Sequence, residues 1–547
     1  MSTVTHDRAV RKIVTGKTIF EYADELSVEV PTSCQRNGRC HECVVEIRRG
    51  MAALSSPSEA ESFLRGDFRL ACQATVISDE CDIEFAALRR RPRILTSNPP
   101  KSGLVLDTPV RVDSGKVYYD DEELGTDRGH QFGLAIDLGT TTVAMELVDL
   151  RTGEGVRSCS FENPQRFGGS DVMNRISYDG AAGNGELQQS VVAAINREIM
   201  DFCSALKFSR HEIYEVVVAA NTTMRDILFK LDVQSIGQRP YKSLVEHEFS
   251  AGRRSGTALT ERARKLGLLA NPRAPVYGMP LVSCHVGGDL AAGLAALDIT
   301  AEGAESIMLV DMGTNTEVFV RHRGRMMVAS CPAGPAFEGG LVKYGMPAYD
   351  GAIEKFRIDA NGGGMNYETI GDIAPVGLCG SGLIDLLAEL RRHDMLTAKG
   401  VFTADKRQFE LVLFPEYGIS FSKEDASNLG QAKAANYCGQ LIVLRTLGIN
   451  PEDIDKLYLA GGFAHHVDVA SAVEIGLLAP VSETRVVRAG NTSLSGARDV
   501  LVSRKKRQAL EQLVLQIEHV ELETSDDFFE LFVDGCQFKP MPKRLNQ

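Results

Sequence analysis

The stretch FGLAIDLGTTTVAMELVDL, residues 132–150, places an acidic residue and a Gly-Thr turn between two apolar segments. This pattern predicts two strands joined by the turn. Asp137 ends the first strand, Gly139 allows the backbone to approach an anion, and residues Thr140, Thr141 and Thr142 supply N–H and hydroxyl donors. These properties suit a phosphate group. A single Asp-x-Gly-Thr turn is weak evidence, because ordinary β-turns use the same residues.

The same arrangement occurs a second time at residues 306–324, SIMLVDMGTNTEVFVRHRG. The equivalent residues are Asp311, Gly313, Thr314, Asn315 and Thr316. The repetition indicates an internal duplication of one structural unit. Two such turns facing each other across a cleft would bind the phosphates of one nucleotide, while the two aspartates would hold Mg²⁺ through water.

Three further glycine-containing segments are candidates for the same site. Gly461 and Gly462 follow an apolar strand in LYLAGGFAHHVD, where bare backbone could lie against a base or ribose. Asp289 begins a small-residue helix and could contact metal-bound water, and Gly380 and Ser381 lead into another helix, whose N-terminus can bind an anion. Each glycine segment is also compatible with a purely structural turn. The chain has no P-loop pattern, so this would be a different solution to phosphate binding.

Cysteines form a second motif in TSCQRNGRCHECVVEI, residues 32–47. Clusters of the [2Fe–2S] kind are held by four thiolates, and plant-type ferredoxins supply three from one loop and one from far downstream. Cys34, Cys40 and Cys43 match the loop, and Cys72 in FRLACQATV is the expected fourth ligand. Cys81 is an alternative to Cys72.

Two other interpretations of the cysteines explain less. A zinc ribbon would need two Cys-x-x-Cys pairs, and the loop has only Cys40–Cys43. A thioredoxin-like redox pair would leave Cys34 and Cys72 without a role. The segment resembles a [2Fe–2S] ferredoxin of β-grasp fold, with the longer first gap of the adrenodoxin branch. The resemblance implies one-electron transfer at low potential.

Composition and charge limit the remaining possibilities. At 547 residues the chain should form roughly three or four folded units. A net charge of −13 argues against nucleic acid as a partner. No apolar run approaches the roughly 18–20 residues needed to span a bilayer, so we expect a cytoplasmic protein that does not enter the membrane. The twelve cysteines are too scattered for a disulfide framework.

The expected fold class is α+β and α/β multidomain. Residues 1–88 would form the ferredoxin domain, and residues 89–130, which include RRRPRILTSNPPKSG, would form a linker. The phosphate turns, Asp289 and the glycine segments together resemble the ATPase fold shared by actin, sugar kinases, acetate kinases and Hsp70 (ASKHA), with two RNase H-like lobes. The lobes would occupy residues 131–300 and 301–547, the second with a C-terminal extension.

A ferredoxin fused to such an ATPase resembles the reductive activators of corrinoid proteins. The segments VVAANTTM, DMGTNTEV, SCPAGPAFEGG, GLCGSGLIDL and LAGGFAHH all look like that family. The resemblance implies ATP-dependent reduction of inactive cob(II)amide to cob(I)amide in a corrinoid protein that serves methyl transfer. It also implies a low-potential electron donor and a homodimer formed through the ATPase domain. Ser330 is a possible contact at the corrinoid face, although the residues favour a backbone-capping role for this serine.

Two other functions remain possible on the sequence. One is an ATP-dependent activator of a radical dehydratase, which has a similar ATPase but carries no ferredoxin domain. The other is a ferredoxin-type electron carrier whose ATPase-like part only senses nucleotide. Stimulation of ATP turnover by a cobalt(II) corrinoid protein would separate these possibilities.

Overall fold

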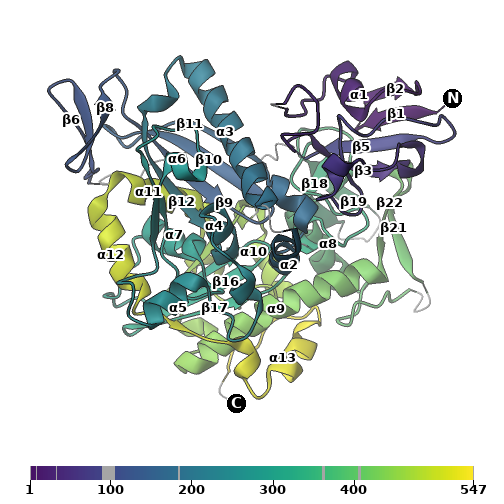
Figure 1. Ribbon diagram of the computed structural model, residues 1–547. Coiled ribbons are helices and arrows are strands. Elements are labelled where there is room, and N and C mark those ends of the chain that lie inside the picture. Colours follow the sequence, from purple (N-terminus) through teal and green to yellow (C-terminus); the bar gives the residue numbers. More distant parts are fainter. Residues whose placement is uncertain are drawn as a thin grey trace.

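The computed structural model describes residues 2–7, 9–32, 34–88, 105–182, 185–334, 336–359, 364–404, 408–462 and 464–545. An N-terminal domain is followed by two larger lobes (Figure 1). The first part of the expected linker, residues 89–104, lies outside the described residues. The second part does not behave as a linker: it forms a three-stranded antiparallel sheet of β6 (Val110–Asp113), β7 (Lys116–Tyr119) and β8 (Glu122–Thr126). In the described part of the chain no helix has the length and apolar character needed to cross a membrane.

The N-terminal domain is a five-stranded sheet with one helix, as expected for a β-grasp ferredoxin. The strand order is β2-β1-β5-β3-β4. Its elements are β1 (Thr3–His6), β2 (Ala9–Lys12), α1 (Ile19–Glu25), β3 (Val44–Arg49), β4 (Phe68–Leu70) and β5 (Ile83–Ala87). Helix α1 starts at a capping box in which Thr18 and Glu21 satisfy each other's backbone N–H groups. The cysteine loop then runs from this helix region into β3.

The first lobe is built on a six-stranded sheet in the order β11-β10-β9-β12-β14-β13. The strands are β9 (Phe132–Leu138), β10 (Thr142–Asp149), β11 (Gly155–Glu162), β12 (Ile213–Ala220), β13 (Leu259–Arg262) and β14 (Pro275–Gly278). The helices are α2 (Val172–Ala182), α3 (Glu186–Leu206), α4 (Thr222–Leu228), α5 (Leu244–Ser250), α6 (Ala263–Leu266) and α7 (Gly288–Ala296). Strands β9, β10 and β11 are antiparallel neighbours, and β12 runs parallel to β9.

The second lobe repeats five of these strand positions in a sheet of order β24-β23-β15-β16-β17-β25, with its sixth strand at the other edge. Its strands are β15 (Ile307–Met312), β16 (Thr316–His322), β17 (Arg325–Cys331), β23 (Lys456–Ala460), β24 (Val486–Gly490) and β25 (Glu518–His519). Strands β15, β16 and β17 are antiparallel neighbours, and β23 runs parallel to β15. The duplication expected from the two Asp-x-Gly-Thr turns is therefore present in the sheets that carry them.

Smaller sheets and helices complete the second lobe. They are β18 (Ala352–Ile358), β19 (Met365–Thr369), β20 (Gly377–Leu378), α8 (Gly380–Arg392), β21 (Glu410–Phe414), β22 (Ile419–Ser422), α9 (Lys423–Leu447), α10 (Val469–Glu474) and α13 (Phe528–Gly535). Helix α9 crosses the lobe beside α13 at the lower edge of the molecule (Figure 1).

Two helices join the lobes. Helix α11 (Thr492–Val502) packs tightly against α7, and both share one apolar core with residues of the two sheets, such as Val217 and Leu309. Gly496 permits this approach, because a Cβ there would lie 1.9 Å from the carbonyl oxygen of Ala292. Helix α12 (Arg504–Val514) also packs on α7. Residues 492–514, which sequence order placed in the second lobe, thus lie against elements of the first.

Lys433 of α9 is a buried amine whose Nζ has no hydrogen-bond partner in the described structure. Burial lowers its pKa to about 7 from 10.5. Between these two values the unfolded chain holds a proton that the folded protein lacks, so this site makes stability rise with pH. We expect Lys433→Met to raise the free energy of unfolding by about 2 kcal/mol below pH 7 and by progressively less towards pH 10. Denaturant titration at pH 6, 8 and 10 measures this; a difference independent of pH would contradict it.

Candidate functional site: two thiol pairs and an interlobe cavity

The four predicted cysteines meet as two pairs. The sulfur atoms of Cys43 and Cys72 lie 3.4 Å apart. The thiols of Cys34 and Cys40 also contact each other. A binuclear cluster needs two thiolates on each iron, so this arrangement fits a [2Fe–2S] group. Cys72, and not Cys81, is the downstream cysteine that reaches the loop.

The backbone of the loop is shaped to surround an anionic group. Backbone N–H groups of Asn37, Arg39 and Cys40 point at the sulfur of Cys34. Gly38 has a φ of +80°, and a Cβ there would lie 3.1 Å from that of Ala60. Successive left-handed residues turn N–H groups towards one side of a chain. The donors and thiols together therefore fit the sulfur-rich cluster that the spacing predicts.

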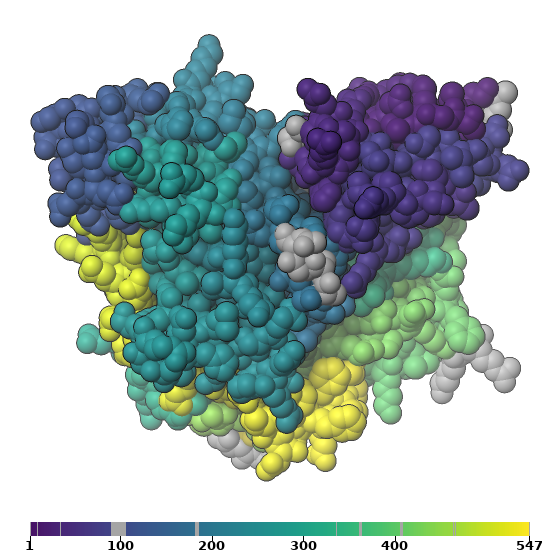
Figure 2. Space-filling model, viewed as in Figure 1, coloured from purple at the N-terminus to yellow at the C-terminus, as the bar shows by residue number. Residues whose placement is uncertain are grey.

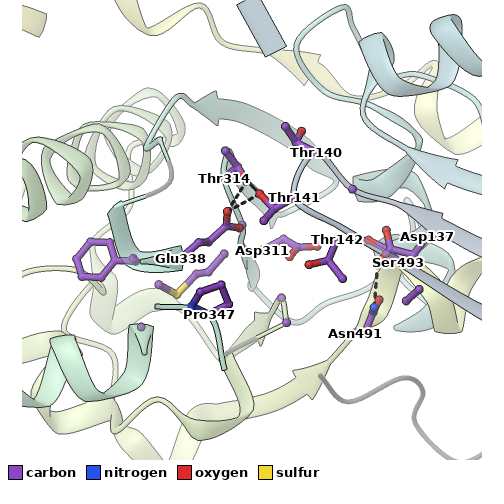
Figure 3. Close-up of a pocket in the computed structure, with 18 of the residues that line it drawn as sticks. Asp137, Thr140, Thr141, Thr142, Asp311, Thr314, Glu338, Pro347, Asn491 and Ser493 are labelled. Atoms are coloured by element: carbon purple, nitrogen blue, oxygen red, sulfur yellow. Dashed lines mark hydrogen bonds between the residues drawn. The ribbon is translucent and has the colours of Figure 1, made fainter. Parts of the chain in front are cut away.

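The two Asp-x-Gly-Thr turns face each other in one cavity between the lobes (Figure 3). The space between its walls is about 1270 Å³, which includes open solvent at the mouth. The predicted residues that line it are Asp137, Gly139, Thr140, Thr141, Thr142, Asp289, Asp311, Gly313, Thr314, Asn315, Gly380, Gly461 and Gly462. Segments from five distant parts of the chain thus converge there.

Three predicted residues do not line this cavity. Thr316 is buried in β16 opposite Cys331. The hydroxyl of Ser381 donates to the backbone carbonyl of Glu354 within the second lobe. The hydroxyl of Ser330, a partly exposed residue of β17, donates to the carboxylate of Glu317 at 3.4 Å and not to a backbone group.

Glu338 is a residue that the sequence interpretation missed. One of its carboxylate oxygens accepts hydrogen bonds from the hydroxyls of Thr141 and Thr314, each at 2.7 Å. These threonines belong to the two different phosphate turns, so Glu338 joins the lobes at the centre of the cavity (Figure 3). Burial raises its pKa. The sequence signal for Glu338 was an acidic residue within the glycine-rich segment AFEGG.

Two asparagines were also missed, and both line the cavity at the start of a helix. Asn221 follows β12, caps α4 and donates to the hydroxyl of Thr140 at 2.9 Å. Asn491 follows β24, caps α11 and donates to the carboxylate of Asp137 at 2.8 Å. Each stands between a strand and a threonine, as NTT and NTS. This Asn-Thr pair was the available signal for both residues.

The cavity is strongly acidic. Burial raises the pKa of Asp137 to about 7 and that of Asp311 to about 8, with repulsion from neighbouring carboxylates adding to both. Burial also raises the pKa of Asp289 and of Glu317, a further residue that was missed. Carboxylate oxygens are the protein ligands that Mg²⁺ prefers, and a cation would relieve their repulsion.

The carboxylates of the cavity are not placed for several of them to coordinate one metal ion directly. Within the described residues, no three histidine, cysteine, aspartate or glutamate side chains are arranged to hold a metal ion. Mg²⁺ usually keeps several waters and takes one or two carboxylates together with substrate phosphates. The carboxylates fit that mode of binding, through water, better than a closed site made by protein alone.

The cavity also reaches the edge nearest the N-terminal domain. Glu162, at the end of β11, and Tyr349 of the second lobe both line it. The Tyr349 hydroxyl donates to the Glu162 carboxylate at 2.6 Å, which is another direct hydrogen bond between the lobes. At the opposite wall, Gly461 has a φ of +111°, and a Cβ there would lie 2.2 Å from the carbonyl oxygen of Met312. The close contact with the second phosphate turn therefore requires glycine.

Comparisons with known proteins agree with the fold. A 2Fe-2S iron-sulfur cluster binding domain matches residues 4–76. The RACo middle region matches residues 132–302, and the C-terminal domain of RACo, the ASKHA domain, matches residues 305–545. A solved structure of a reductive activator for corrinoid,iron-sulfur protein superposes with a TM-score of 0.72 at 27% identity, over 100% of both chains.

Two curated relatives carry related descriptions. The corrinoid activation enzyme RamQ of Eubacterium limosum is 28% identical over 431 residues, 74% of this chain and 70% of the relative. The [Co(II) methylated amine-specific corrinoid protein] reductase of Methanosarcina barkeri is 24% identical over 436 residues, 74% of this chain and 76% of the relative. The two RACo models together span most of the chain. The chain therefore belongs to the RACo family and carries, in order, a [2Fe–2S] ferredoxin domain, the RACo middle region and the ASKHA domain.

Proposed function

We propose that this protein is an ATP-dependent reductive activator of a corrinoid protein. It transfers one electron from its [2Fe–2S] cluster to the partner's cobalt, converting inactive cob(II)amide to cob(I)amide for methyl transfer. The electron originates from a low-potential donor that rereduces the cluster. ATP hydrolysis accompanies the cycle and yields ADP and phosphate. The protein acts as a homodimer through its ATPase domain.

The observation that carries this proposal is the joining of two sites in one chain. The thiol loop, which suits one-electron chemistry, belongs to the N-terminal domain. This domain docks on the first of the two lobes that enclose the acidic cavity. The relatives described above act on corrinoid proteins, and one is a cobalt(II) corrinoid reductase. Neither a simple carrier nor a simple kinase would need both parts.

The cysteine loop serves electron transfer. When bound, a [2Fe–2S] cluster supplies one electron. In plant-type ferredoxins the reduction potential of this cluster is near −400 mV. Cys34 and Cys40 would hold one side of the cluster, and Cys43 and Cys72 would hold the other. The N–H groups aimed at Cys34 stabilise negative charge on the group and so influence its potential.

The cavity serves ATP. Gly139 and Gly313 let the two turns approach the phosphates, and the hydroxyls of Thr141 and Thr314 are released from Glu338 to donate to them. Asp137 and Asp311 would hold hydrated Mg²⁺ from opposite lobes, and a hydrogen bond from Asn491 keeps Asp137 in place. The bare backbone at Gly461 and Gly462 accommodates the nucleoside.

Selective recognition of cobalt(II) is the property that tests this function. ATP can drive a directed cycle only if the protein binds the cobalt(II) state differently from cobalt(I) or methylated cobalt. With a purified corrinoid protein, we expect a complex in the cobalt(II) state that loosens on adding ATP. With a low-potential reductant present, the absorbance change from cobalt(II) to cobalt(I) should depend on ATP.

Two results together would contradict the activator function. They are cobalt reduction at the same rate without ATP, and equal affinity for the corrinoid protein in every cobalt oxidation state. The protein would then be an electron carrier that senses nucleotide.

A further inference from the structure

A short turn of the first lobe lies against the N-terminal domain. Residues Pro164–Gly168 form a 3-10 helix directly after β11. Its Phe167 packs edge-on against Phe63 of the ferredoxin domain, with ring centroids 5.8 Å apart. Behind it, the Tyr178 hydroxyl of α2 donates to the backbone carbonyl of Phe63 at 2.7 Å. Figure 2 shows the purple domain lying beside the teal first lobe.

The same turn carries an ion pair between the domains. Arg166 donates to both carboxylate oxygens of Glu46, a β3 residue of the ferredoxin domain, at 3.3 and 3.5 Å. Its other terminal nitrogen donates to Glu162 at 3.3 Å. The Glu162 side chain is only 7% exposed, so its interactions are less screened than those at an open surface. One guanidinium thus bridges a ferredoxin carboxylate and a carboxylate that lines the cavity.

Glu162 continues this connection into the second lobe. Its first carboxylate oxygen accepts from Tyr349, and its second accepts from Arg166. A change in the position of Arg166 therefore alters the acceptor that holds Tyr349 at the cavity wall. Glu46, Arg166, Glu162 and Tyr349 form an unbroken series of contacts from the ferredoxin sheet to the cavity, which we name the Glu46–Tyr349 series.

The turn is anchored to the phosphate-binding region as well. Asn163, fully buried, donates its backbone N–H to the carbonyl oxygen of Thr141 at 2.8 Å. Its side chain donates to the carbonyl oxygen of Gly139, also at 2.8 Å. The segment that contacts the ferredoxin domain is consequently fixed to the first Asp-x-Gly-Thr turn, and it cannot shift independently of that turn.

We propose that the Glu46–Tyr349 series couples docking of the ferredoxin domain to nucleotide binding, with Arg166 as the positioning residue. This rests on the proposed function, because the cavity must bind ATP. The docked domain holds Arg166 between two carboxylates, which keeps Glu162 available to Tyr349 and the lobes closed at that edge. Because coupling between binding events is reciprocal, nucleotide also strengthens docking of the ferredoxin domain. The cluster domain and the ATP cavity thereby change state together.

The chain provides a matched control for this coupling. Glu29 of the ferredoxin domain forms a second ion pair to the first lobe, with Arg197 of α3. Neither residue lines the cavity. Glu46→Gln and Glu29→Gln therefore each remove one carboxylate charge from the docking interface, but only the first acts on the Glu46–Tyr349 series.

The test is a double-mutant cycle on ATP affinity in the full-length protein, measured by calorimetry. Glu46→Gln should raise the Kd for ATP about fivefold, at the lower end of typical coupling, whereas Glu29→Gln should change it less than about twofold. Tyr349→Phe should also weaken binding, and adding Glu46→Gln to it should have no further effect. An unchanged [2Fe–2S] EPR signal in each variant shows that the ferredoxin domain remains folded.

Each result has a distinct meaning. If Glu46→Gln leaves the Kd unchanged, or acts equally strongly in the Tyr349→Phe background, the coupling is wrong even when the unaltered protein reduces a corrinoid protein with ATP. If the unaltered protein binds no ATP, both proposals fail. If the cycle shows coupling but no cobalt is reduced, the coupling stands and only the proposed reaction is overturned.

Discussion

Cys72→Ala is expected to abolish the visible absorption of the cluster and the EPR signal of the reduced protein. The sulfur of Cys72 lies 3.4 Å from that of Cys43, and the pair would hold one iron. Without Cys72, the iron held by this pair lacks one of its two thiolate ligands. Reduction of a cobalt(II) corrinoid protein should fall to background, whereas ATP binding should survive because the nucleotide cavity lies in the other domains.

Cys81→Ala is the matched control, since it removes another partly buried thiol of the same domain. It should retain the full EPR signal. Loss of the signal in Cys81→Ala with retention in Cys72→Ala would transfer the fourth ligand to Cys81. Iron and sulfide analysis of both purified variants would distinguish a lost cluster from an altered spectrum.

Asp311→Asn is expected to lower ATP hydrolysis by roughly 10²-fold, a loss typical of removing one electrostatic contact at a reaction centre. The neutral amide keeps the shape of the side chain but cannot balance the charge of hydrated Mg²⁺. Asp137→Asn should have a similar effect from the opposite lobe. Steady-state phosphate release measures both, and the [2Fe–2S] spectrum should remain unchanged.

A less stable Asp311→Asn protein would also hydrolyse ATP more slowly, but the electrostatics of the site predict no loss of stability. Burial and the neighbouring Asp289 and Asp137 raise the pKa of Asp311 to about 8, so its ionisation destabilises the nucleotide-free fold. Asp311→Asn should therefore melt no lower than the unaltered protein. Asp455→Asn, at an exposed position outside the cavity in the same lobe, should hydrolyse ATP normally. Normal hydrolysis in both Asp311→Asn and Asp137→Asn would contradict the two-turn site.

Local sequence was sufficient where the chemistry depends on spacing. The alternation around Asp137 and around Asp311 predicted two strand–turn–strand units, and both appear in the same topological position of their sheets. The spacing of Cys34, Cys40 and Cys43 predicted a loop, and the loop brings its thiols together in pairs with the help of Cys72. In each case the decisive residues lie within one turn or one hairpin.

Sequence order was misleading where the chain returns to an earlier domain. Helix α11 follows the second lobe in sequence but packs against α7, β9 and β12 of the first. The expected linker likewise contains the sheet of β6, β7 and β8, whose strands of four or five residues are too short to be predicted with ease. Such placements depend on which apolar faces remain to be covered after the sheets form.

Residue spacing alone predicts both kinds of site: a four-thiol loop for a [2Fe–2S] cluster, and a pair of phosphate turns on duplicated sheets. How these parts meet follows from the packing of the folded chain. Asn491 reaches Asp137 across 354 positions, and Glu338 reaches Thr141 across 197. The series from Glu46 to Tyr349 joins three domains. Spacing along the chain governs contacts within a turn or hairpin, whereas partners this distant are chosen by the packing of the lobes and the need to satisfy buried polar groups.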